Sequence, residues 1–348
     1  MIESLLLFVA LNTPPTPPTP PTTPTTLSTT LPTTLPTATP TPATLPQPAL
    51  PQPALPAAAA DQGRAGTMTP GPLVLVGAGD IAQCPSPNHE KTAVLVERVL
   101  AKSLQATAFT LGDNVYPHGS LEQYFRCYEP SWGRFKSRTL PVVGNHEYET
   151  PNAAGFRGTF AGRFSTKGPL WYSVDVSGLG SDGAPARWHV VVLDSNCDKV
   201  ECGVGSAQYT WLVADLKKNA ATRCTVALFH HPRFSSGPHG DASTMKDLWR
   251  ALDQADVDLV LSGHDHTYER FAALNSEGVV VKGAGIASIV AGTGGKSHYP
   301  ILASRQHSAF HAADDYGVLV LGLDNGGWRS HLLTVTGEEK DKNDGTCH

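Results

Sequence analysis

Five short strings along the chain combine side chains that bind metal ions or move protons. They are Gly79-Asp80, Gly112 to Tyr116, Gly144 to Glu147, His230-His231 and Gly263 to His266. Two aspartates, one asparagine, one tyrosine and three histidines among them are already more than one four-coordinate ion uses. A pair of ions needs such a set, because a shared carboxylate and further oxygens balance the charge while imidazoles fix the geometry. The residue types therefore favour a two-metal centre.

Apolar runs precede most of these strings and predict buried strands that end where the polar residues begin. The runs are Leu73 to Val76, Ala108 to Leu111, Thr225 to Phe229 and Val257 to Leu261. Strand ends are where α/β sheets build their sites. We therefore expect the five strings to meet at one edge of the fold.

Helical patterns alternate with these runs, and further strands follow them. The expected helices are Glu90 to Leu104, Leu121 to Phe135, Ser206 to Lys218 and Met245 to Leu252. The further strands cover residues 140–143, 171–176, 188–193, 279–282, 286–291, 318–323 and 330–336. This alternation predicts an α/β fold of the α+β type. The expected architecture is a four-layer αββα sandwich, in which helices flank two mixed sheets.

The first seventy residues differ in composition from the rest. Residues 1–11 contain an apolar run of the length of a signal-peptide core, without its basic residues. Residues 12–70 are rich in Pro, Thr and Ala, a composition that cannot bury a core and predicts a disordered leader or linker. Residues 71–348 are left as a single expected catalytic domain.

Net charge and cysteine content narrow the class of protein. The net charge of −5 and the scattered Lys and Arg residues predict that nucleic acid is not a partner. The six cysteines show no zinc-type spacing and favour disulfides in an oxidising compartment. Six cysteines allow fifteen pairings. We predict the pairs Cys84–Cys127 and Cys197–Cys202.

Taken in order, the five strings resemble the motif blocks of the calcineurin-like metallophosphoesterase superfamily. Within it, the chain is most similar to the purple acid phosphatases, because Gly112 to Tyr116 matches their Gly-Asp-x-x-Tyr block. The tyrosine of that block binds ferric iron. Other branches carry Asp-x-His in the first block, where this chain has Ala82. The resemblance covers about Leu73 to Gly295.

The resemblance implies seven metal ligands divided between two ions. Asp80, Tyr116 and His266 are the expected ligands of the first ion, which would be Fe3+. Asn145, His230 and His264 are the expected ligands of the second, which would be Zn2+, Mn2+ or Fe2+. Asp113 is expected to bridge the two ions.

Two further histidines are expected to act on the substrate. His146 adjoins Asn145 and is placed to contact phosphate, although orienting Asn145 is an alternative role. The spacing of His239 from His230 resembles that of the family's candidate general acid, and a mobile loop histidine is the alternative.

These residues predict an enzyme, a metal-dependent phosphatase acting on phosphomonoesters. Hydroxide that the metal ions make available near neutral pH would attack phosphorus in line. A phosphodiesterase or nucleotidase on the same centre is the alternative, because the loops 117–121, 150–167 and 297–311 select the ester. A rival of another class is a non-catalytic binding module displayed at a surface, against which the complete ligand set argues.

The expected partners are small phosphoesters, and no transmembrane span is predicted. The expected location is secreted, periplasmic or cell-surface, with the Pro/Thr-rich segment as a means of surface association. Two other motifs are rejected as nucleotide sites. Gly77 to Ala82 matches a dinucleotide fingerprint, but Cys84 to Pro87 prevents the helix that it requires. Ala291 to Ser297 resembles the end of a Walker A loop but is predicted to be a turn at the rim of the metal site.

Overall fold

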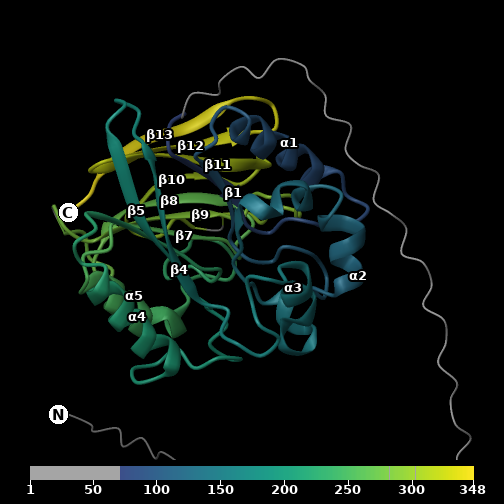
Figure 1. Ribbon diagram of the computed structural model, residues 1–348, viewed down its shortest axis with the longest axis horizontal. Helices are drawn as coiled ribbons and strands as arrows, with labels where there is room; N and C mark the ends of the chain where they lie inside the picture. Colours follow the sequence, from purple (N-terminus) through teal and green to yellow (C-terminus); the bar gives the residue numbers. More distant parts are fainter. Residues whose placement is uncertain (1–70, 282, 302) are drawn as a thin grey trace, which may run out of the picture. The chain divides into compact units, whose positions relative to one another are not determined.

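The computed structural model describes residues 71–281, 283–301 and 303–348. The segments predicted at 1–11 and 12–70 lie outside the described residues. Within the described part, two mixed β-sheets lie face to face with helices on their outer faces (Figure 1). The predicted α/β sandwich is confirmed.

The two sheets contain six and seven strands. The first has the order β13 (Glu339–Thr346), β12 (Gly327–Thr334), β11 (Gly317–Asp324), β1 (Val74–Ala78), β2 (Ala106–Thr110) and β3 (Thr139–Leu140). The second has the order β10 (Ser308–Ala312), β8 (Tyr268–Leu274), β9 (Ile286–Ala291), β7 (Leu259–Ser262), β6 (Cys224–Leu228), β5 (Pro185–Val192) and β4 (Tyr172–Leu179). Strands β1, β2 and β3 run parallel, as do β5, β6, β7 and β9. Parallel strands place their carboxyl ends on one edge of each sheet.

The main hydrophobic core lies between the sheets. Leu75 and Phe109 of the first sheet and Val190 and Leu261 of the second are fully buried in it. The rings of Trp188 and Trp328 meet edge to face, with centroids 6.0 Å apart. Burying this much apolar surface is the principal force that holds the two sheets together.

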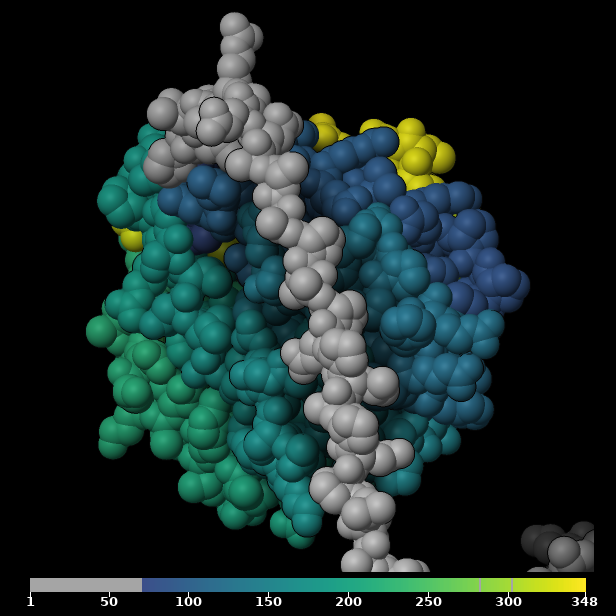
Figure 2. Space-filling view, turned by 45° about the vertical axis from the view of Figure 1, so that its right-hand side comes forward, coloured from purple at the N-terminus to yellow at the C-terminus, as the bar shows by residue number. Residues whose placement is uncertain are grey.

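Helices cover the outer face of each sheet and form the two outer layers. On the first sheet, α1 (Asn88–Leu100) buries Ala93, Val96 and Leu100 in a cluster that includes Val318 of β11. Figure 2 shows the blue segment of α1 next to the yellow C-terminal strands. On the second sheet, α4 (Ala207–Lys218) and α5 (Lys246–Asp253) bury a cluster that includes Leu212 and Trp249.

The structure departs from the expected elements at several places. The single helix expected over 121–135 is divided into α2 (Leu121–Gln123), the π-helix Tyr124–Tyr128 and the 3-10 helix Trp132–Arg138. Pro130 explains the break, because its ring and missing N–H stop a helix there. The strand expected at 279–282 is wrong over its described residues, because Val279 to Val281 form no strand beyond one isolated bridge at Val280. The remaining short elements near the site are α3 (Ala154–Thr159) and the 3-10 helices His146–Glu149, Pro151–Ala153 and Ser243–Met245.

Three disulfides link the described cysteines. The predicted pairs Cys84–Cys127 and Cys197–Cys202 are both present. The third bond, Cys224–Cys347, joins the start of β6 in the second sheet to the end of β13 in the first. It fastens the two sheets at the end of β6 opposite to the polar strings.

The Cys224–Cys347 bond should stabilise the fold more than the Cys197–Cys202 bond does. A cross-link removes more entropy from the unfolded chain when it closes a longer loop, and the two bonds span 123 and 5 residues. We expect the double variant Cys224→Ala/Cys347→Ala to lose about 5 kcal/mol of unfolding free energy, against about 2 kcal/mol for Cys197→Ala/Cys202→Ala. Urea unfolding of both variants measures the difference. Equal losses would contradict the loop-length argument.

Candidate metal centre

The polar strings meet where strands of both sheets end. Asp80 follows β1 and Asp113 follows β2 in the first sheet, whereas His230 follows β6 and His264 follows β7 in the second. The backbone N–H of His264 donates to Asp80 Oδ2 at 2.8 Å, so the site joins the two sheets directly. All four residues lie within the expected edge of the fold.

One half of the site is built around the hydroxyl of Tyr116. This hydroxyl lies 2.8 Å from Asp80 Oδ1, 2.9 Å from Asp113 Oδ2 and 3.2 Å from His266 Nε2. His266 Nε2 is also 3.4 Å from Asp80 Oδ1. The structure thus brings together the three residues that were predicted to bind one ion, with Asp113 beside them.

The other half of the site is built around His230. Its Nε2 atom lies 2.9 Å from Asn145 Oδ1, 3.2 Å from His264 Nδ1 and 3.4 Å from Asp113 Oδ1. The three residues predicted for the second ion are therefore neighbours. Asp113 directs one carboxyl oxygen to each half.

Backbone carbonyl groups fix which nitrogen of two histidines faces the site. His230 Nδ1 donates to the carbonyl of Leu111 at 2.7 Å, and His266 Nδ1 donates to that of Ser297 at 2.7 Å. A carbonyl can only accept, so each Nδ1 carries a proton and each Nε2 is directed to the donor cluster. Imidazoles that bind metals are commonly held in this way.

Burial and charge at the site fit the binding of cations. Asp80 and Asp113 are almost completely inaccessible to solvent. Burial raises the pKa of Asp80 to about 8, His230 opposes this shift, and the charge of Asp113 adds to it. Burial alone would lower the pKa of His230, but Asp113 beside it raises the value to about 9. Buried acidic groups placed this close together favour a positive charge beside them.

The backbone of the site is held in an unusual conformation. Asp80, Asp113 and His264 have φ values of 60°, 49° and 72°. Residues other than glycine rarely adopt this left-handed region, and such strain concentrates at functional sites. The fit of donor types, tautomers, charge and backbone supports two ions, and ligand atoms of Asp80, Asp113 and His230 lie within 4.8 Å of one another.

His146 is partly exposed and His239 is exposed, and both lie next to the donor cluster. The backbone N–H of His146 donates to Asp113 Oδ1 at 2.9 Å, and its ring lies 4.5 Å from that of Tyr116. The ring of His239 lies 4.2 Å from the ring of His264. Both predicted substrate histidines are therefore beside the cluster.

Glu147 holds the backbone of two of the polar strings, a role that the sequence analysis did not assign. It is fully buried, and its carboxyl group accepts from the backbone N–H groups of Asp113, Asn114 and Gly144 at 2.7 to 3.1 Å. Burial raises its pKa to about 7, and the charge of Asp113 contributes. Its place directly after Gly-Asn-His was the only signal in the sequence.

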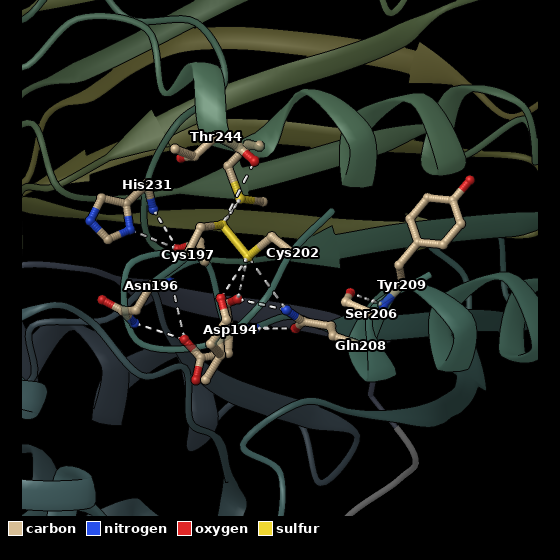
Figure 3. Close-up of a disulfide and its surroundings, with 12 residues drawn as sticks. Asp194, Asn196, Cys197, Cys202, Ser206, Gln208, Tyr209, His231 and Thr244 are labelled. Atoms are coloured by element: carbon tan, nitrogen blue, oxygen red, sulfur yellow. Dashed lines mark hydrogen bonds between the residues drawn. A yellow bond between two sulfur atoms is a disulfide. The ribbon is translucent and has the colours of Figure 1, made fainter. Parts of the chain in front are cut away.

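A second supporting residue, Ser195, lies just after β5 and was also missed. Its Oγ accepts from the backbone N–H groups of His230 at 3.1 Å and His231 at 2.9 Å. Figure 3 shows the neighbouring loop, which the Cys197–Cys202 bond closes. There, Gln208 of α4 donates to the carbonyl of Asp194, and Asn196 donates to the Asp194 carboxyl group.

His231 is close enough to His230 and His264 to suggest a further ligand. Ser195 argues against this role. Because the Ser195 hydroxyl oxygen already accepts two N–H groups, its own proton is donated to His231 Nδ1 at 2.9 Å. Burial lowers the pKa of His231 to about 3, so the ring is neutral. The expected set of metal ligands therefore stays at seven, with His230 as the ligand of this pair.

The two rejected nucleotide motifs have structural explanations. After β1, Asp80 turns into the site and helix α1 begins only at Asn88, so no helix follows the Gly77 to Ala82 turn. The turn from Gly292 to Ser297 lies at the rim of the site, as predicted. Its Gly294 and Lys296 N–H groups donate to the carbonyls of Gly79 and Asp80 at 2.9 Å each.

Known proteins share both sequence and fold with this chain. The calcineurin-like phosphoesterase family matches residues 73–268. Purple acid phosphatase 23 of Arabidopsis thaliana is 30% identical over 174 residues, which cover 44% of this chain and 35% of that protein. The chain spans about a third of the length of such curated relatives. The predicted resemblance to purple acid phosphatases is confirmed.

Solved structures show the same fold at low sequence identity. Purple acid phosphatase PPD1 from yellow lupin (Lupinus luteus) seeds has a TM-score of 0.63 and 17% identity, covering 80% of this chain and 54% of that one. GAP50, the anchor in the inner membrane complex of Plasmodium, has a TM-score of 0.60 and 18% identity, covering 79% and 89%. The family match extends over more than half of the residues, and its range contains all seven donors from Asp80 to His266. The chain therefore belongs to the calcineurin-like phosphoesterase family.

Proposed function

We propose that residues 71–348 form a metal-dependent phosphatase domain that hydrolyses phosphomonoesters. The observation that carries the proposal is the position of Asp113, whose two carboxyl oxygens face two separate groups of three donors. Family membership and the purple acid phosphatase relatives support the same activity.

We assign the seven donors to two ions. Asp80, Tyr116 and His266 would hold one ion, and Asn145, His230 and His264 the other, with Asp113 between them. A phenol among the ligands favours Fe3+ in the first position, whereas two imidazoles and an amide suit Zn2+, Mn2+ or Fe2+. When bound, such a pair of ions acidifies water and neutralises charge on phosphoryl oxygens.

The chain's own residues would place the ester and complete the proton transfer. His146 lies beside Asp113 and Tyr116, where its ring can donate a hydrogen bond to a phosphoryl oxygen. His239 lies over His264, where its ring can protonate the oxygen of the departing alcohol. No protein nucleophile is needed in this scheme.

The proposed location is secreted, periplasmic or cell-surface. Three disulfides among the described residues favour an oxidising compartment. Over residues 71–281, 283–301 and 303–348, the helices are too short and too polar to cross a bilayer. Small phosphoesters are the proposed partners, and association with a cell surface through the Pro/Thr-rich segment remains part of the proposal.

Two ester substrates distinguish the proposed phosphatase from its alternatives. We expect kcat/KM for p-nitrophenyl phosphate to exceed that for bis-p-nitrophenyl phosphate by at least about tenfold, which corresponds to about 1.4 kcal/mol of transition-state binding. A preference for the diester would favour the phosphodiesterase alternative. If the protein hydrolyses neither ester, a non-catalytic binding module is favoured. GAP50, which shares the fold, is described as an anchor.

A further inference from the structure

The loop that carries His239 rests on two buried carboxyl groups outside the donor cluster. The loop runs from Ser235 to His239, between β6 and α5. The carboxyl groups belong to Asp265, after β7, and Glu269, on β8, and both residues are 0% exposed. Neither residue was assigned a role from the sequence.

Asp265 lies between two expected metal ligands but turns its carboxyl group to the loop. Its Oδ1 accepts from the backbone N–H of His239 at 3.1 Å, and its Oδ2 accepts from the hydroxyl of Ser235. The same hydroxyl oxygen accepts from the N–H of Gly237 at 3.0 Å. Both oxygens of Asp265 are therefore engaged by the loop, and the side chain holds His239 through its backbone.

The contact between Asp265 and the loop leaves no room for a side chain at Gly237. A Cβ atom placed on Gly237 would lie 2.2 Å from the carboxyl carbon of Asp265. Such a distance is shorter than any van der Waals contact, so only glycine allows the loop to approach the carboxyl group this closely. The position of the loop therefore depends on its contact with the Asp265 carboxyl group.

Glu269 fixes the middle of the same loop. Its Oε2 accepts from the backbone N–H of Ser236 at 2.8 Å, and its Oε1 accepts from the Ser236 hydroxyl at 2.5 Å. The Ser308 hydroxyl of β10 also donates to Oε1 at 2.5 Å. The N–H of Arg305 in turn donates to Ser236 Oγ at 2.7 Å. Glu269 therefore ties the loop to β10, and Ser236 ties it to the segment that precedes β10.

We propose that Asp265 and Glu269 are positioning residues that hold the His239 ring over His264 for protonation of the leaving group. The inference rests on the proposed function. As the bond from phosphorus to the leaving oxygen breaks, that oxygen takes a proton from His239 while the oxygen of water joins phosphorus. One proton of the water stays on the phosphate product, and the other returns to His239 through solvent. A loop fixed by buried carboxyl groups keeps the proton donor within reach without further ordering.

The first test compares two leaving groups in the Asp265→Asn variant. Departure of p-nitrophenolate needs little protonation, whereas the alkoxide of glycerol 3-phosphate needs a proton. We expect kcat for glycerol 3-phosphate to fall by about tenfold to a hundredfold while kcat for p-nitrophenyl phosphate stays within about threefold. Glu269→Gln should show the same selectivity and serves as a second variant if Asp265→Asn does not fold. Equal losses on both substrates would overturn the proposal.

A double-variant cycle asks whether Asp265 acts through His239. In a His239→Ala background, Asp265→Asn should cause no further loss on glycerol 3-phosphate, because the group that it positions is gone. Asp258→Asn is the matched control, since Asp258 is also buried and accepts two backbone N–H groups, from Thr225 and His348, at the opposite end of β7. This control should leave the leaving-group selectivity unchanged. Full additivity of Asp265→Asn and His239→Ala would contradict the proposal.

Hydrogen exchange tests the contact independently of turnover. Amides of residues 235–241 should exchange faster in Asp265→Asn than in the unmodified protein, and not in Asp258→Asn, because local opening depends on the bonds that close the loop. Unchanged exchange would overturn the positioning role. If the unmodified protein hydrolyses neither ester, the proposed phosphatase activity fails, and exchange alone decides whether the carboxyl groups hold the loop.

Discussion

Replacing Asp113 with asparagine is expected to reduce hydrolysis of p-nitrophenyl phosphate by at least about 10³-fold, because a shared carboxylate underlies both halves of a two-metal site. His230 and Tyr116 would then face an amide that supplies a single oxygen. Asparagine tolerates the φ of 49° found at this position, so the backbone should keep its course. Steady-state rates on the purified variant measure the effect.

Elemental analysis of the same variant separates loss of ions from loss of fold. The unmodified protein should contain two ions per chain, and Asp113→Asn should contain fewer. Asp258→Asn, a buried carboxyl group far from the site, should keep both its ions and its rate. Undiminished activity in Asp113→Asn would remove the basis for the bridging assignment.

Removing the ions with a chelator is expected to abolish activity and lower the melting temperature. The ions bind only the folded chain, and a ligand at about a thousand times its dissociation constant adds about 4 kcal/mol of stability. For a domain of this size, that corresponds to about 10 °C in the melting temperature. Differential scanning calorimetry before and after chelation gives the shift.

Asp113→Asn provides the control for chelation, because a variant that has lost its ions should melt at the same temperature with or without chelator. Returning single ions to the stripped protein then identifies them. Fe3+ bound by the Tyr116 phenolate should give an absorption band in the visible, absent in Tyr116→Phe. A chelated protein that keeps both its rate and its melting temperature would refute the metal centre.

Much of the site could be predicted from the sequence because each donor follows an apolar run within a few residues. Asp80 and His264 lie two residues beyond β1 and β7, so the edge on which parallel strands end determines their neighbourhood. Buried runs such as those of β6 and β7 are easily read as strands, because the absence of polar residues leaves few alternatives. Short apolar runs in the sequence were therefore enough to predict that donors far apart in the chain lie close together in the fold.

The supporting residues could not be predicted in the same way. Asp265 stands between His264 and His266, and nothing in the sequence shows that its carboxyl group turns to Ser235 and His239. Ser195 acts through an ordinary hydroxyl whose partners are 35 and 36 residues away. Such roles depend on side-chain directions and on contacts between distant segments, which a motif does not encode.

Elements at the margins of the fold were missed for a different reason. The sequence of β13, from Glu339 to Thr346, contains no apolar alternation because it forms the outer strand of the first sheet. The prediction of a helix over 121–135 did not take Pro130 into account. This proline interrupts the helix despite the aromatic residues around it. The spacing of apolar residues alone is therefore a weak predictor of a strand or helix at the surface of the fold.

The Cys224–Cys347 bond gives the two sheets a permanent hinge at the end remote from Asp80 and His264. At the opposite end, no disulfide among the described residues joins the two sheets, and contacts such as the hydrogen bond from His264 to Asp80 hold them together. Loss of the ions should consequently let the two sheets separate first at the metal site, while the disulfide keeps them together at the other end.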